Sequence, residues 1–146
     1  MIARLAYVLL LVTFCASAHA KVIHEERSLY RNIIIDETNS VRCMRFVLRQ
    51  RGTHNQSCID LKDPQRLVFE YTQKVMLALT LKPEPKRILV VGLGGGSLPM
   101  SFHELLPDAE ILSLEIDPAV VKAAKQFFSY KENEQVNTET IDARVF

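Results

Sequence analysis

RILVVGLGGGSLP, residues 87–99, joins a short apolar strand to a glycine cluster and then to the start of a helix. Gly92, Gly94 and Gly96 follow the apolar run directly. Since glycine has no side chain, the turn can be tight and its N–H groups can approach a ligand closely. The dinucleotide fingerprint G-x-G-x-x-G needs a glycine at the sixth position, where this chain has Ser97. The stretch therefore predicts a strand–turn–helix unit whose glycines either bind a ligand or serve the turn alone.

Helix and strand patterns alternate after this turn. A helix is expected over residues 97–106, a strand over 111–116, a helix over 118–128 and a last strand over 136–146. Asp117 fits the N-cap of the second helix, with Pro118 in its first turn. Strand–helix–strand–helix–strand order is the signature of a parallel α/β sheet.

The residues before the turn have a different pattern. Two β-rich runs, 29–37 and 41–49, flank the turn-prone Thr38-Asn39-Ser40, and the second alternates apolar side chains with arginines. We expect antiparallel strands with one solvated face. The remaining segments are expected to be a polar lead-in over 21–28, a turn over 51–56, a short strand over 57–61 and an amphipathic helix over 64–81.

The fold class is therefore α/β, with a small N-terminal antiparallel β unit followed by the first half of a Rossmann-like parallel sheet. The predicted boundaries are 1–20 for a signal peptide, 21–63 for the β unit and 64–146 for the partial Rossmann-like domain. The chain has 146 residues, 48% hydrophobic and 24% charged, with a formal net charge of +1. This balance is that of a folded protein without the basic surface of a nucleic-acid binder.

Residues 1–20 resemble a secretory leader, with one arginine, an apolar run and Ala18-His19-Ala20 before Lys21. We expect cleavage there and an exported chain, periplasmic or secreted, that meets a membrane only through its leader. An uncleaved anchor is the alternative, although the apolar run is shorter than the ~20 residues that span a bilayer. A second alternative is that residues 1–20 are not a leader and the chain is cytoplasmic.

Two cysteines, Cys43 and Cys58, remain after such cleavage. They either pair across neighbouring strands in an oxidising compartment or stay as buried thiols. Their spacing fits no zinc pattern, and we expect no metal site.

Acidic residues follow the predicted strands at places that suit a nucleoside. Glu115 lies nineteen residues past Gly96, where a carboxylate can accept from both ribose hydroxyls. Asp142 follows the third strand, where it can accept from an adenine amino group, and Ala143 N–H can donate to a ring nitrogen. A solvated strand end is the alternative for Glu115.

RSLYRNIII, QSCIDL, FEYTQKVMLAL, the glycine stretch, EID and IDARVF occur in the order that is typical of spermidine synthases. From about Glu25 to Phe146 the chain resembles this family of polyamine aminopropyltransferases, which has the class I S-adenosylmethionine-dependent methyltransferase fold. The resemblance implies transfer of an aminopropyl group from decarboxylated S-adenosylmethionine to an amine, leaving methylthioadenosine. The implied partners are a nucleoside, a polyamine and a second copy in a homodimer.

The resemblance also implies a set of cofactor-binding residues. Glu115 would hold ribose, Asp142 with Ala143 would hold adenine, and Gln56 and Tyr71 would lie near the sulfur and the transferred chain. The turn glycines complete the set: Gly92, Gly94, Gly95 and Gly96.

Three positions depart from the family pattern. Gly95 replaces the aspartate that binds the aminopropyl arm, and Arg31 replaces a glutamine. The catalytic aspartate follows the fourth Rossmann strand in the family, and no residue up to Phe146 is assigned its role. Glu70 and His103 are expected to be an ordinary surface carboxylate and an ordinary helix residue. We therefore expect a truncated chain that lacks the catalytic segment.

Two alternatives to an aminopropyltransferase remain. A methyltransferase that uses S-adenosylmethionine fits Gly95, because a methyl donor keeps a carboxylate that glycine-turn N–H groups can bind. A non-catalytic exported protein that binds a nucleoside fits the leader and the early end. A nicotinamide-dependent oxidoreductase is the weakest hypothesis, because Ser97 breaks the fingerprint.

Overall fold

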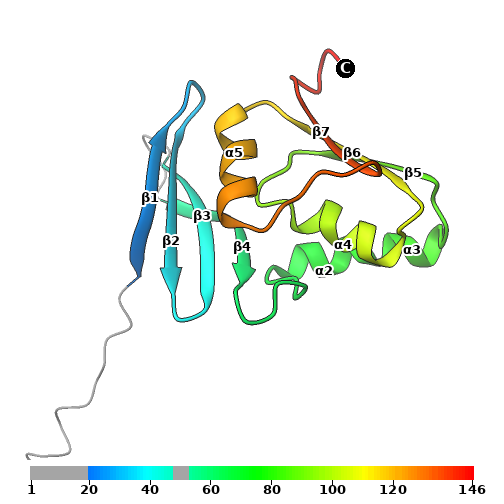
Figure 1. Cartoon of the computed structure of the whole chain (residues 1–146), viewed down its shortest axis with the longest axis horizontal. Coiled ribbons are helices and arrows are strands. Elements are labelled where there is room, and N and C mark those ends of the chain that lie inside the picture. Colours follow the sequence, from blue (N-terminus) through cyan, green and yellow to red (C-terminus); the bar gives the residue numbers. More distant parts are fainter. Residues whose placement is uncertain (1–19, 48–52) are drawn as a thin grey trace, which may run out of the picture.

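The chain folds into two sheets that are joined through one helix (Figure 1). The computed structural model describes residues 20–47 and 53–146. The predicted leader up to residue 19 therefore lies outside the described residues, as do Leu48, Arg49 and the start of the predicted 51–56 turn. A four-stranded antiparallel sheet precedes a three-stranded parallel sheet that carries helices, which is the predicted fold class.

The first sheet has the order β1-β2-β3-β4. Its strands are β1 (Lys21–Arg27), β2 (Asn32–Thr38), β3 (Val41–Val47) and β4 (Thr53–Asp60). Two predictions were wrong: the 21–28 lead-in forms β1, and residues 53–56 of the predicted turn belong to β4. Pairing with a neighbouring strand explains both, because β1 pairs along its length with β2, and β4 with β3. The charged sequence of β1 is typical of an edge strand protected against further pairing.

The second sheet follows the predicted alternation closely. Its elements are β5 (Arg87–Val91), α4 (Ser97–Leu105), β6 (Glu110–Glu115), α5 (Pro118–Phe127) and β7 (Val136–Thr140), with the strand order β5-β6-β7. The last strand ends at Thr140, so the predicted continuation to Phe146 was wrong. Asp117 caps α5, accepting from the Ala119 backbone N–H at 3.0 Å, as predicted.

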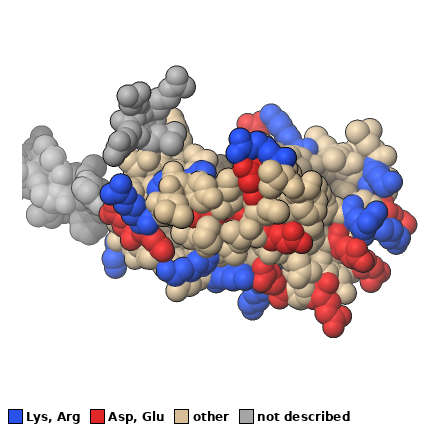
Figure 2. All heavy atoms as spheres, turned by 90° about the horizontal axis from the view of Figure 1, so that it is seen from above, with Lys and Arg blue, Asp and Glu red and all other residues tan. Residues whose placement is uncertain are grey.

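The predicted helix over 64–81 is shorter and divided. It consists of α2 (Glu70–Met76) and α3 (Ala78–Leu81). Leu67 forms an antiparallel bridge with Ile59 of β4, so its backbone is extended rather than helical. No helix in residues 20–47 or 53–146 has the length and apolar content needed to cross a bilayer. On the face shown in Figure 2, Lys and Arg side chains lie among Asp and Glu side chains.

Helix α5 contributes to both hydrophobic cores. Val120 and Ala123 pack with first-sheet side chains such as Ile33 and Met44. Ala124, on another face of the helix, packs in the second core with residues of β6 and β7. Burial on these faces holds the two sheets together, and Figure 1 shows α5 between them.

The glycine turn packs closely against the chain that follows α5. Gly96 has a φ of +80°, and a Cβ atom built there would lie 2.5 Å from Cδ2 of the buried Tyr130 ring. Gly92, with a φ of +91°, has open space around the same position. The two glycines share the left-handed region but differ in packing.

Gly96→Ala is expected to lower the free energy of unfolding by about 2–4 kcal/mol. The left-handed backbone costs about 1–2 kcal/mol for an alanine, and displacement of Tyr130 adds about 1–3 kcal/mol. The matched Gly92→Ala variant should show only the first cost. Denaturant unfolding of both variants measures the difference, and equal losses would contradict the packing role of Gly96.

Candidate functional site

A cavity of about 460 Å³ lies at the carboxyl ends of the parallel strands, between the two sheets. One side is formed by the glycine turn and by the residues that follow β6 and β7. The other side is formed by β4, the start of α2, Phe46 of β3 and Arg31 from the β1–β2 turn. This is the place where open α/β sheets bind their ligands.

Seven of the nine predicted cofactor-binding residues line this cavity: Gln56, Tyr71, Gly92, Gly94, Glu115, Asp142 and Ala143. Gly95 and Gly96 are buried behind the turn and do not line it. The structure thus brings residues from five separate parts of the sequence to one cavity. Their binding roles stay predictions.

Glu115, at the end of β6, is fixed in place by backbone donors. Its side chain is 8% exposed. Oε2 accepts from Leu93 N–H in the glycine turn at 3.0 Å, and Oε1 accepts from Asp117 N–H at 3.1 Å. Each carboxylate oxygen has a further lone pair, so the group can still accept from a bound hydroxyl. The contact also ties the glycine turn to the neighbouring strand.

Gly95 has no space for a side chain in this arrangement. A Cβ atom built there would lie 2.6 Å from Ser57 Oγ and 2.9 Å from Cδ1 of Phe128. A side chain at this position would require the Ser57 hydroxyl and the Phe128 ring to shift. The glycine therefore serves close packing between the turn and the first sheet.

Asp142 lies two residues beyond the end of β7. Ile141 N–H donates to Glu115 C=O at 3.0 Å, which keeps this segment beside β6. Both oxygens of the Asp142 carboxylate accept from Arg144 Nε, each at 3.0 Å. Hydrogen bonds from the Arg144 side chain and backbone lower the pKa of Asp142 to about 2. An adenine amino group would share this carboxylate with Arg144.

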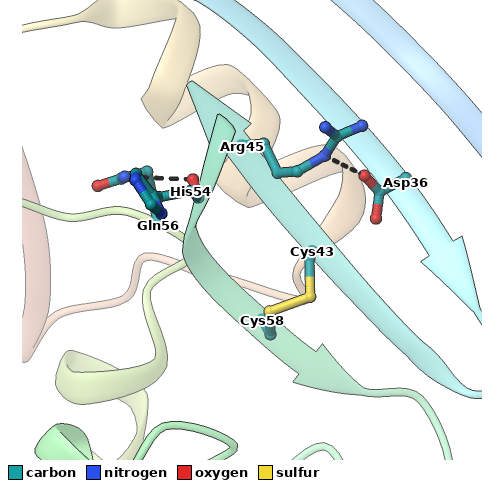
Figure 3. The surroundings of a disulfide bond; sticks show 6 residues. All are labelled: Asp36, Cys43, Arg45, His54, Gln56 and Cys58. Atoms are coloured by element: carbon teal, nitrogen blue, oxygen red, sulfur yellow. Dashed lines mark hydrogen bonds and ion pairs between the residues drawn. A yellow bond between two sulfur atoms is a disulfide. The ribbon is translucent and has the colours of Figure 1, made fainter. Parts of the chain in front are cut away.

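Gln56 and Tyr71 contribute polar groups to the opposite wall. Gln56 is exposed on β4, and its amide donates to the His54 carbonyl at 3.2 Å (Figure 3). Tyr71 is 55% exposed in the first turn of α2, with its ring stacked on Phe69 at 5.7 Å between centroids. Both side chains can turn toward a ligand without breaking a buried contact.

Cys43 and Cys58 form a disulfide between β3 and β4 (Figure 3). The two residues are direct partners in the register of the strands, which resolves the alternatives left by the sequence. Cys58 and Ser57 are also part of the cavity wall, a position that sequence reasoning missed. Only the register between β3 and β4 could have indicated this position. That register depends on the first half of β4, which was not predicted as a strand.

Glu70 and His103, two other side chains with the chemistry of a general base, lie outside this cavity. Glu70 is exposed and pairs with Lys74 at 2.7 Å. His103 contacts Asn133 through Nε2 at 3.1 Å. Among the described lining residues, Glu115 and Asp142 are the carboxylates, and both already accept hydrogen bonds. Within residues 20–47 and 53–146, no cluster of His, Cys, Asp and Glu could hold a metal ion.

No family model matches the chain. It is 38% identical over 127 residues to a polyamine aminopropyltransferase of Vibrio vulnificus, covering 86% of this chain and 42% of that protein. It is 39% identical over 71 residues to the eEF1A lysine and N-terminal methyltransferase of Mus musculus, covering 45% of this chain and 10% of that protein.

The fold also matches a solved structure. A probable spermidine synthase from Corynebacterium glutamicum superposes with a TM-score of 0.70 at 19% identity, covering 86% of this chain and 46% of that chain. The chain thus spans less than half the length of these relatives. Over that part it is spermidine synthase-like in sequence and fold, which confirms the resemblance noted from the motifs.

Replacing Arg144 is expected to change the titration of Asp142. In Arg144→Gln the carboxylate loses its charge-assisted partner, so its pKa should rise from about 2 toward the ordinary 3.8. The carboxyl-carbon NMR signal of Asp142, followed between acid and neutral pH, measures this shift. An unchanged midpoint would show that Arg144 does not hold the carboxylate in solution.

Proposed function

We propose that the cavity binds the nucleoside part of an S-adenosylmethionine-type donor, and that the chain supports transfer of a group from that donor. The observation that carries the proposal is the fixed carboxylate of Glu115. It lies at the carboxyl end of β6, next to the glycine turn, with acceptor capacity left for ribose hydroxyls. A cavity of about 460 Å³ is of the size that holds small ligands.

Adenine is expected to lie toward the segment after β7. Asp142 would accept from the amino group and Ala143 N–H would donate to a ring nitrogen. Gly92 and Gly94 line the cavity, so the backbone of the glycine turn would lie beside the sugar and the sulfur of the ligand. Gln56 and Tyr71 would contact the region around the sulfur from the other wall.

Two groups are candidates for transfer. Aminopropyl transfer to a polyamine is supported by the 38% identity to a polyamine aminopropyltransferase. Methyl transfer is supported by Gly95, which supplies no carboxylate for a cationic arm and whose Cβ position is crowded by Ser57 and Phe128. The catalytic base of either reaction is unassigned, and the relatives are more than twice as long as the matched segment. A chain that binds the nucleoside without transfer is the third candidate.

Methylthioadenosine binding tests the nucleoside site. In isothermal titration calorimetry the full chain should bind methylthioadenosine, and Glu115→Ala should weaken this binding at least tenfold. The reason is that hydrogen bonds to a charged group contribute about 1.5–3 kcal/mol. Glu115→Gln, which keeps an acceptor for Leu93 N–H, should weaken binding less.

Glu110→Ala is the matched control for this test. Glu110 is an exposed carboxylate at the opposite end of the same strand, so its removal should leave the affinity unchanged. Thermal unfolding of each variant checks that the fold is retained. Equal affinity in folded Glu115→Ala and in the control would refute the site assignment.

We also propose export and an oxidised Cys43–Cys58 pair in the mature chain. The proposal is supported by the leader-like residues 1–20 and by the disulfide that joins β3 and β4. Disulfides persist in oxidising compartments.

Cells lysed in iodoacetamide without reductant should yield a chain that begins at Lys21 with no alkylated cysteine. Reduction before alkylation should add two labels, on Cys43 and Cys58. Intact mass and peptide mapping measure both results. Two labels without reduction, or a mass that retains residues 1–20, would count against export.

A further inference from the structure

Arg31 presents a cation to the cavity that no acidic side chain of the described residues neutralises. Its Cζ lies 4.4 Å from the centroid of the buried Phe46 ring, an arrangement that orients the guanidinium by cation–π attraction. The neighbouring arginines behave differently, because Arg42 pairs with Glu37 and Arg45 pairs with Asp36. In residues 20–47 and 53–146, the Arg31 guanidinium makes no hydrogen bond or ion pair.

The backbone of Arg31 is connected to Glu115 through hydrogen bonds. Its N–H donates to Ser28 Oγ at 3.0 Å, and that hydroxyl lies 2.5 Å from Asp117 Oδ2. Asp117 N–H in turn donates to Glu115 Oε1. A short chain of hydrogen bonds therefore fixes the backbone of Arg31 relative to the proposed ribose site, and the contact with Phe46 orients its guanidinium.

The charges of the cavity wall are otherwise occupied. Of the lining residues, Arg31, Glu115 and Asp142 are charged. Glu115 accepts from two backbone N–H groups, and Asp142 accepts from Arg144. Gly95 adds no carboxylate and has no space for one. A donor arm that ends in an ammonium group alone would meet a cation here without an available anion.

We propose that Arg31 binds the carboxylate of the donor's amino-acid arm, so that the cavity selects S-adenosylmethionine over its decarboxylated form. The inference rests on the proposed nucleoside site and specifies the ligand class of that site. A guanidinium matches a carboxylate with two parallel N–H···O bonds, which an ammonium arm cannot accept. Among the two candidate transfers, it favours the methyl group.

Three stable thioethers distinguish the contribution of the arm to binding from that of the nucleoside. They are S-adenosylhomocysteine, its decarboxylated form and methylthioadenosine. They share the adenosine and differ in the arm, and none can transfer a group. In calorimetry with the full chain, S-adenosylhomocysteine should bind about 10–100-fold more tightly than the decarboxylated form. The reason is the one charge-assisted pair between the Arg31 guanidinium and the ligand carboxylate. Arg31→Gln should reduce this ratio to within twofold, and Arg31→Lys should retain part of it. Methylthioadenosine affinity should change by less than twofold in both variants.

Arg27→Gln is the control, because Arg27 is an exposed cation at the end of β1 that does not line the cavity. It should leave all three affinities unchanged. If methylthioadenosine binds but the other two ligands bind equally well, or the decarboxylated form binds better, the Arg31 inference is overturned and the nucleoside site stands. If none of the three binds to the folded chain, both proposals are overturned. An unchanged ratio in folded Arg31→Gln also overturns the inference.

Discussion

The burial of α5 on two of its faces is the constraint on which the site depends. Apolar contacts hold it to both cores, and three polar contacts fix its position along the first sheet. Asp117 at its start lies 2.5 Å from Ser28, Lys122 pairs with Glu26, and the Phe127 carbonyl accepts from Arg42 at 2.9 Å. Since the cavity has one wall from each sheet, its shape is set by this helix rather than by the glycine turn alone.

The second sheet was predictable because its signals are local. β5 ends where the apolar run does, α4 begins after the glycines, and α5 begins at the Asp117-Pro118 cap. The first sheet was less predictable because pairing decides it. The polar sequence of β1 has no strand signal of its own. It is extended because it pairs with β2 from Lys21 to Arg27, apart from a bulge at Ile23. The late start of α2 likewise follows from the Leu67–Ile59 bridge, a contact between separate segments.

The candidate site shows the same division. Strand ends in a parallel sheet meet at one edge, so the places of Glu115 and Asp142 follow from the order of elements. The sequence could not distinguish the roles of the four glycines. Whether a glycine faces the cavity or a packed side chain depends on the conformation of the folded turn. Gly92 and Gly94 open toward the cavity, whereas Gly95 and Gly96 accommodate Ser57, Phe128 and Tyr130. The pairing of Asp142 with Arg144 also required coordinates, since nothing in the IDAR pattern distinguishes it from a free carboxylate.

The disulfide in the wall has a chemical consequence for the kind of ligand proposed. A sulfonium donor is an alkylating agent, and a thiolate is the side chain most ready to attack it. Cys58 contributes to the cavity wall, yet its sulfur is bonded to Cys43 and forms no thiolate. The oxidised hairpin would thus leave the wall inert toward its own donor, whereas the reduced hairpin would place a self-modifying nucleophile in that wall.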